Sequence, residues 1–161
     1  MEPSEIKCKI IAACNRGHEK AVLRDILDLL FPYDAKVTGK IIAGGKLCFQ
    51  TSLNLETIAL LFRRYPIRNL LSLRYILSMI PARENILDGI IWLLEENCKN
   101  RKLFRKISVR IKGSDGWRQE YFDKIKVMLK ECQGGILDGI LEYEGGNLLL
   151  EAKVPLINLR M

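Results

Sequence analysis

The sequence predicts a mixed α+β protein made of two halves. Three observations support this class: short runs in which apolar and polar residues alternate, longer runs with apolar residues at helical spacing, and proline or Gly-Gly pairs between them. The chain has 161 residues, of which 48% are hydrophobic and 28% charged, which is the balance of a folded protein with a sizeable core. Pro81 falls between the halves, so we expect domains at residues 1–80 and 81–161.

The first half contains six predicted elements. Asn15-Arg16-Gly17 forms a turn, Pro32 and Pro66 each end a helix, and Gly44-Gly45 joins two strands as a hairpin. The resulting order, βαββαβ, is the ferredoxin-like arrangement, with two helices on one face of an antiparallel sheet. The predicted elements are a strand at 6–14, a helix at 18–31, strands at 36–43 and 47–51, a helix at 55–65 and a strand at 69–79.

The second half is predicted to have the order αβαββ. Its first strand alternates cleanly: Ile107, Val109 and Ile111 point one way and basic residues point the other, which predicts one buried face and one cationic face. The Gly145-Gly146 pair is predicted to turn the closing hairpin. The predicted elements are a helix at 83–98, a strand at 106–112, a turn at 113–116, a helix at 117–131 and strands at 136–143 and 148–154.

The positive charge of the chain is concentrated in one segment. The net charge is +7, and residues 99–118 hold eight bases and one acid, leaving 18 bases and 18 acids elsewhere. Such a local excess indicates a site for a polyanion, although a solvated charged face is the alternative. Trp117 could stack on an unpaired base, or it could fill the core. The candidate RNA-binding residues are Lys99, Arg101, Lys102, Arg105, Lys106, Arg110, Lys112, Trp117 and Arg118.

No catalytic or metal-binding pattern stands out. The five cysteines include no C-x-x-C pair, so we expect scattered, reduced, buried thiols and neither a metal nor a cofactor. His18 is the only histidine and has no nucleophile pattern around it. There is no long apolar run and no signal peptide, so we expect a cytoplasmic protein without membrane contact.

Several phrases of the chain resemble the THUMP domain family of RNA-modification proteins. They are Asn15 to Glu19 (N-R-G-H-E), Phe104 to Arg110, and Gly135 to Asp138 before a closing hairpin. The first half resembles the ferredoxin-like domain that commonly precedes THUMP. The resemblance implies an α+β fold, with the ferredoxin-like βαββαβ half packed on a THUMP-like αβαββ half, and tRNA as the partner.

The length of the chain resembles that of the stand-alone branch of this family. Catalytic members carry a further methyltransferase, deaminase or thiouridine synthase domain, whereas this chain ends at Met161. The resemblance therefore implies a tRNA-binding adaptor that is not itself an enzyme and takes no small-molecule substrate. It would serve a separate tRNA-modifying enzyme, as in cytidine acetylation.

Two other functions remain open at the level of the sequence. One is a structural or assembly subunit of a ribonucleoprotein or protein complex. The other is an RNA-modifying enzyme of unrecognised type. Arg63, Arg64, Arg68 and Arg74 form a second basic group in the first half, which we regard as a set of secondary RNA contacts.

Overall fold

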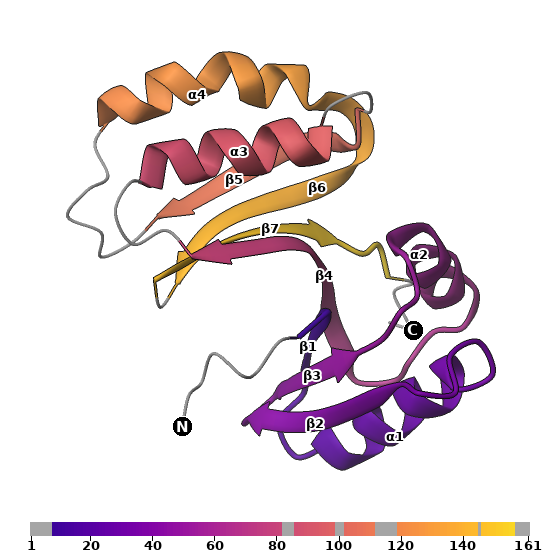
Figure 1. Cartoon of the computed structure of the whole chain (residues 1–161). Helices are drawn as coiled ribbons and strands as arrows, with labels where there is room; N and C mark the ends of the chain where they lie inside the picture. Colours follow the sequence, from indigo (N-terminus) through magenta and orange to yellow (C-terminus); the bar gives the residue numbers. More distant parts are fainter. Residues whose placement is uncertain (1–7, 82–85, 99–101, 112–118, 145, 157–161) are drawn as a thin grey trace. The chain divides into compact units, whose positions relative to one another are not determined.

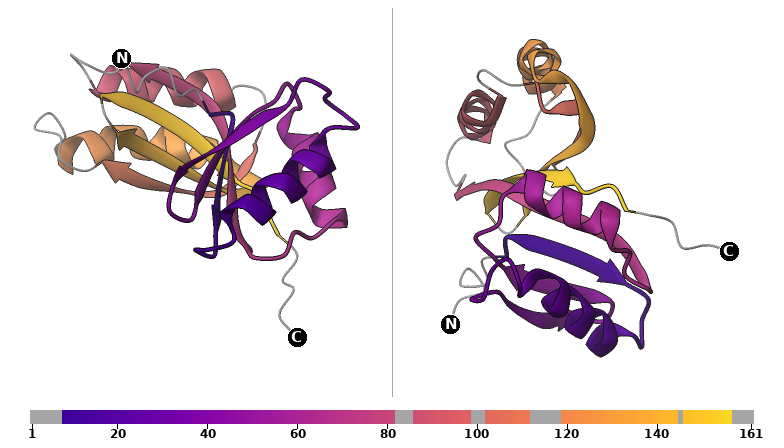
Figure 2. Two further views of the ribbon diagram at one scale, coloured as in Figure 1. Left: turned by 90° about the horizontal axis from the view of Figure 1, so that it is seen from below. Right: turned by 90° about the vertical axis from the view of Figure 1, so that its right-hand side faces the viewer.

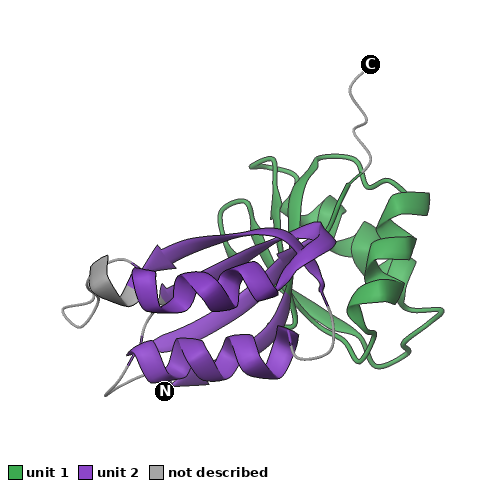
Figure 3. Cartoon of the chain, turned by 90° about the horizontal axis from the view of Figure 1, so that it is seen from above, with its two compact units in different colours: residues 1–75, 154–161 green, residues 76–153 purple. Residues whose placement is uncertain are grey.

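A computed structural model describes residues 8–81, 86–98, 102–111, 119–144 and 146–156, and it divides the chain into two compact units (Figures 1 and 3). Unit 1 comprises 1–75 and 154–161, and unit 2 comprises 76–153. The predicted domains 1–80 and 81–161 stay a prediction. The elements are β1 (Ile10–Cys14), α1 (Glu19–Leu30), β2 (Thr38–Ala43), β3 (Lys46–Gln50), α2 (Leu55–Arg64), β4 (Leu70–Pro81), α3 (Ile86–Cys98), β5 (Phe104–Ile111), α4 (Gln119–Glu131), β6 (Gln133–Glu144) and β7 (Asn147–Lys153).

Unit 1 has the predicted ferredoxin-like topology. Its strands are hydrogen-bonded in the order β2-β3-β1-β4, and the β2–β3, β1–β3 and β1–β4 pairs are all antiparallel. Helices α1 and α2 lie on one side of these strands (Figures 1 and 2). Asn54 caps α2 by accepting a hydrogen bond from the Thr57 N–H, and Pro66 follows soon after the helix ends. The core is formed by Ile10, Ala12, Val22, Ile26, Leu47, Phe49, Ile58 and Phe62.

Unit 2 places two helices over one face of its strands. Strands β4, β7, β6 and β5 follow one another in this order, with β6 and β7 antiparallel and β5 and β6 parallel. Helix α4 connects the parallel pair, and α3 lies beside it (Figure 1). The largest side chains of this core are fully buried: Ile90, Leu93 and Leu94 of α3, Ile125 of α4, Phe104 of β5, Leu141 of β6 and Leu148 and Leu150 of β7.

The order of elements and the α+β class are confirmed, whereas several element boundaries differ; strand β5, for example, begins at Phe104 rather than 106. Strand β6 begins at Gln133 rather than 136, because Gly134 and Gly135 continue the strand instead of forming a turn. A Cβ atom on Gly135 would collide with the backbone carbonyl of Leu103, so only glycine fits there. Strand β1 begins at Ile10 rather than residue 6. No helix within the described ranges is long and apolar enough to cross a membrane.

Candidate nucleic-acid interface

Strand β5 stands at the end of the strand order of unit 2 and carries four exposed cations at or just before it. We call Lys102, Arg105, Lys106 and Arg110 the β5 strip. A register shift between Phe104 and Lys106 lets Phe104 turn into the core while the next two residues stay exposed. Beyond the shift the predicted alternation is seen only in part: Ile107, Val109 and Ile111 are half-buried rather than buried, and Ser108 between them is half-buried as well.

Arg105 is not a free cation. Its Nε and Nη2 atoms donate to the two carboxylate oxygens of Asp138 on β6, each at 3.0 Å. This hydrogen-bonded pair lowers the pKa of the Asp138 carboxyl and raises the pKa of the Arg105 guanidinium. The Arg105 side chain remains 61% exposed, so the pair lies in solvent and is worth little as a stabilising contact. The segment that looks almost free of acids in the sequence thus receives one from the neighbouring strand.

Two further charged residues belong to this surface. Glu142 is the register partner of Arg110 across the β5–β6 pair, so a second acid lies on the adjoining strand. Lys153 at the end of β7 is exposed, and its charge, after that of Lys106, also lowers the pKa of Asp138. Lys153 was not among the residues predicted from the sequence. In the sequence, Lys153 is only a lysine near the end of the closing hairpin. Its proximity to the acid on β6 becomes apparent only when β6 and β7 are paired.

The structure brings together part of the predicted site. Lys102, Arg105, Lys106 and Arg110 share one strand edge, and all four are exposed. The predicted contacts Lys99, Arg101, Lys112, Trp117 and Arg118 lie outside the described residues. RNA contact by the β5 strip stays a prediction. The stacking of Trp117 on a base stays a prediction as well.

The second basic group lies in unit 1. Arg63 and Arg64 are exposed in the last turn of α2, where cations complement the helix dipole. Arg68 is exposed in the following loop, whereas Arg74 on β4 is half-buried and engaged in another interaction. This group is therefore divided between a helix end and a strand.

The N-R-G-H-E phrase has a clear structural role in unit 1. The Glu19 carboxylate accepts hydrogen bonds from the backbone N–H groups of Gly17 at 2.9 Å and Gly45 at 2.8 Å, which joins the start of α1 to the β2–β3 turn. These backbone hydrogen bonds, with one from its own N–H as the largest contributor, lower the pKa of Glu19. His18 lies 3.2 Å from the Asn69 side-chain amide, so it is part of a loop contact.

The cysteines differ from the sequence prediction. Two disulfides are formed, Cys8–Cys48 and Cys98–Cys132, and only Cys14 of the five is a free thiol. The expectation of reduced thiols was wrong because the pairs are 40 and 34 residues apart in sequence and meet only in the folded chain. Burial, followed by the charge of Glu19, raises the pKa of the Cys14 thiol. Within the described ranges, no group of three or more His, Cys, Asp or Glu side chains could hold a metal ion.

Comparison with known proteins shows the fold. No family model matches the chain, and no curated protein matches it in sequence. Among solved structures, TrmN from Thermus thermophilus superposes with a TM-score of 0.59 and 14% identity over 91% of this chain and 45% of its own. A predicted N6-adenine-specific DNA methylase from Listeria monocytogenes gives 0.58 and 13%, over 91% and 40%. A 4-thiouridine synthetase in an RNA complex with bound ATP gives 0.52 and 11%, over 93% and 42%.

These likenesses support a THUMP-like α/β fold and correct one functional expectation. The chain spans less than half the length of each of these three structures. We expected a protein that is not an enzyme, and the ground for this was the end of the chain at Met161. The expectation is overturned, because the structures with this fold include a predicted DNA methylase and a 4-thiouridine synthetase. The length of the chain carries no information about catalysis.

Proposed function

We propose that this chain is the RNA-binding part of a tRNA-modifying enzyme, which holds a folded tRNA by its phosphates. The observation that carries the proposal is the β5 strip, in which Lys102, Lys106 and Arg110 project exposed cations from one strand edge. Each phosphate that a lysine or arginine neutralises releases condensed counterions, so affinity for RNA follows from such a strip and falls as salt rises.

The comparisons support the choice of RNA as the polyanion. One structure with this fold is a 4-thiouridine synthetase solved in complex with RNA. Another is a predicted N6-adenine-specific DNA methylase, which agrees with base modification but does not bear on the choice of RNA. We therefore propose base modification as the process, with the modifying groups in a catalytic domain that receives the RNA from this chain. We place this activity in the cytoplasm, as the sequence predicts.

Arg105 has a secondary place in this proposal. Its guanidinium is held by Asp138, so it offers phosphate only its remaining N–H donors. Lys153 adds a cation close enough to Asp138 for its charge to lower the pKa of that carboxyl. The proposed contact surface is therefore the β5 strip with Lys153 beside it.

The test is a charge-matched pair of triple variants. K102A/K106A/R110A removes three cations from the β5 strip, and K124A/K126A/K130A removes three exposed cations from α4. We expect the β5 variant to bind tRNA at least about tenfold more weakly near 100 mM salt, with a slope of log K against log salt that is shallower by about 2 to 3. The α4 variant should bind tRNA with nearly the wild-type affinity and slope. Equal tRNA binding by the β5 variant and the wild-type protein would overturn the proposal.

A further inference from the structure

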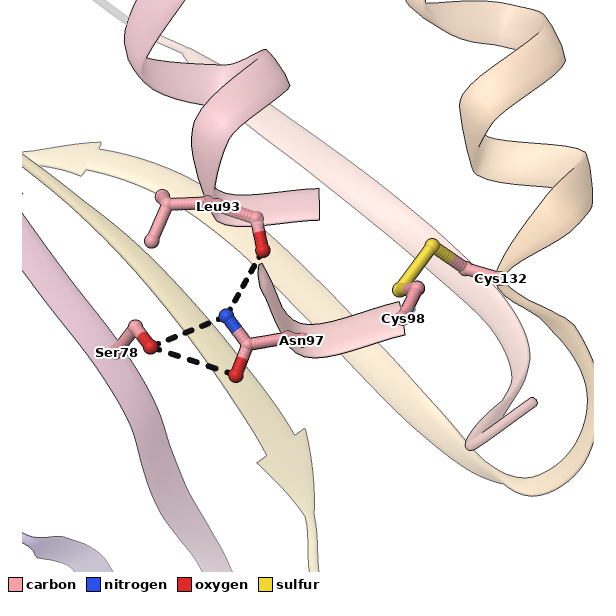
Figure 4. The surroundings of a disulfide bond; sticks show 5 residues. All are labelled: Ser78, Leu93, Asn97, Cys98 and Cys132. Atoms are coloured by element: carbon pink, nitrogen blue, oxygen red, sulfur yellow. Dashed lines mark hydrogen bonds between the residues drawn. A yellow bond between two sulfur atoms is a disulfide. The ribbon is translucent and has the colours of Figure 1, made fainter. Parts of the chain in front are cut away.

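The disulfide Cys98–Cys132 joins the ends of the two helices of unit 2. Cys98 is the last residue of α3, Cys132 directly follows α4, and their Cα atoms are 5.1 Å apart (Figure 4). The covalent loop that it closes contains β5 and every residue of the β5 strip. We propose that this disulfide is a thiol-exchange site whose reduction weakens RNA binding by the β5 strip. The inference rests on the RNA binding proposed above.

A cavity gives a small thiol access to this bond. It has a volume of about 260 Å³ and lies between α3 and α4, lined by Leu94, Glu95, Cys98, Met128, Glu131 and Cys132. Cys98 is half-buried, whereas only 1% of Cys132 is exposed. Because Cys98 is the more exposed residue of the pair, we take its sulfur as the one that an incoming thiolate attacks. Glu95 and Glu131 are exposed on the wall of the cavity, and their carboxylates disfavour the approach of a thiolate most strongly when the reductant carries further negative charges, so a dithiol without other charged groups is preferred.

The backbone around Cys132 supports the start of β5. The Phe104 N–H donates to the Cys132 carbonyl oxygen at 3.3 Å, at the first residue of the strand. The Lys102 side chain lies against Gly134, so closely that a Cβ atom there would come within 2.9 Å of its Cδ. Cys132 and Gly134 thus contact the start of β5 and the side chain of Lys102, the first cation of the β5 strip.

The α3 side of the disulfide is anchored independently. The side-chain amide of Asn97 donates to the Leu93 carbonyl at 2.8 Å and to the Ser78 hydroxyl at 3.0 Å, which holds the last turn of α3 on β4 (Figure 4). Asn97 is only 8% exposed. When the disulfide is broken, α3 keeps this anchor while Cys132 loses its covalent one. The segment that gains freedom is the one that carries Cys132 and supports Phe104.

The exchange reaction balances with a dithiol as the reductant. Its thiolate attacks the Cys98 sulfur, the bond between the two protein sulfurs breaks, and its electron pair leaves on Cys132 as a thiolate that takes up a proton. The second thiol of the reductant then attacks the mixed disulfide and releases Cys98. The reductant ends as a disulfide, and the protein gains two thiols. Disulfides of cytosolic proteins are commonly transient or redox-sensing, which agrees with the compartment proposed above.

The test compares tRNA affinity before and after reduction by dithiothreitol, a neutral dithiol. We use C8S/C48S protein, in which Cys98–Cys132 is the one disulfide of the described residues, and C98S/C132S protein as the matched control. Reduction should weaken tRNA binding by C8S/C48S protein about five- to tenfold, and reoxidation should restore it. C98S/C132S protein should bind tRNA as weakly as the reduced protein and should not respond to dithiothreitol.

Two measurements keep the outcomes separate. Mass spectrometry of the trapped intermediate should find the mixed disulfide on Cys98, and its location on Cys132 would contradict the proposed route of attack. Equal tRNA affinity of oxidised and reduced C8S/C48S protein would overturn the inference while leaving the proposed function intact. Absence of tRNA binding in both states would overturn the proposed function itself. If C98S/C132S protein fails to fold, the test relies on C8S/C48S protein alone. In that protein, tRNA affinity should fall in proportion to the fraction of Cys132 that is reduced.

Discussion

Arg105 on β5 and Asp138 on β6 form a two-point pair across adjacent parallel strands, with both N···O distances at 3.0 Å. The two residues are 33 positions apart in sequence. The pair places a carboxylate inside a surface that the sequence presents as almost purely cationic. It therefore predicts how the surface should respond when that carboxylate is removed.

Replacing Asp138 with Asn should strengthen RNA binding. The change removes one negative charge beside the β5 strip and releases the Arg105 guanidinium, so we expect about three- to tenfold tighter tRNA binding at low salt. Titration of tRNA in 50 and 200 mM salt would measure it, and the gain should shrink at the higher salt. Asp123→Asn changes the charge equally on the exposed face of α4 and should leave affinity unchanged. Weaker binding by D138N would show that the acid positions Arg105 for RNA.

The stability of the protein should depend on pH through Glu19. Its pKa is lowered from 4.5 in the folded protein by backbone hydrogen bonds, so its stabilising contribution is present above about pH 4.5 and is lost as pH falls through the folded pKa. Glu19→Gln should remove this contribution, and the variant should lose less stability than wild type between pH 5 and pH 3. Urea unfolding midpoints across this range would measure the effect. A Glu56→Gln variant controls for the loss of an exposed carboxylate. If its unfolding midpoint also depended less on pH than that of the wild-type protein, the assignment of the effect to Glu19 would be refuted.

Replacing Asn97 with Ala should destabilise the protein by about 1–3 kcal/mol. The buried amide satisfies the Leu93 carbonyl and the Ser78 hydroxyl, and its removal leaves these groups without that donor. Chemical denaturation measures the loss of unfolding free energy. The S78A/N97A double variant should lose less than the sum of the two single variants, because they break one shared hydrogen bond. Strict additivity would mean that the Ser78 contact contributes nothing.

Gly139 should tolerate no side chain. A Cβ atom there would lie 2.6 Å from the ring of Phe104, which is fully buried, so Gly139→Ala should cost about 1–3 kcal/mol. In protein that already carries Phe104→Leu, Gly139→Ala should cost less stability than it does in the wild-type protein, because the smaller side chain leaves room for the methyl group. Gly44→Ala, where the nearest atom is 3.8 Å away, is the control and should be close to neutral. Thermal unfolding of the four variants would decide.

The fold followed from the sequence because most of its elements have one apolar and one polar face. The alternation of residue types around Ile107 and the proline after α2 involve only neighbouring residues, so both can be recognised in the sequence. The ferredoxin-like strand order then follows from the βαββαβ order of elements. The extension of β6 through Gly135 escaped prediction because Gly-Gly favours a turn locally, and the close approach of Leu103 is a tertiary requirement.

The site could be predicted only in part, because its electrostatics depend on which strands are neighbours. The cations of the β5 strip lie close together in the sequence, so their clustering could be predicted, whereas their contact with RNA stays a prediction. Asp138 and Lys153 join them only through the pairing of β5 with β6 and of β6 with β7. The Cys98–Cys132 bond likewise requires that the ends of α3 and α4 meet, and neither helix encodes this by itself.

Strand β5 ends the strand order of unit 2, so one side of its backbone has no neighbouring strand among the described residues. Such an exposed backbone can recruit an extended segment of another molecule, and lysine or arginine side chains are a common defence against it. We therefore expect Lys106 and Arg110 to oppose self-association through this strand even when no RNA is bound. Any variant that neutralises them gives up this protection as well, and its colloidal behaviour at high concentration should deteriorate along with its affinity.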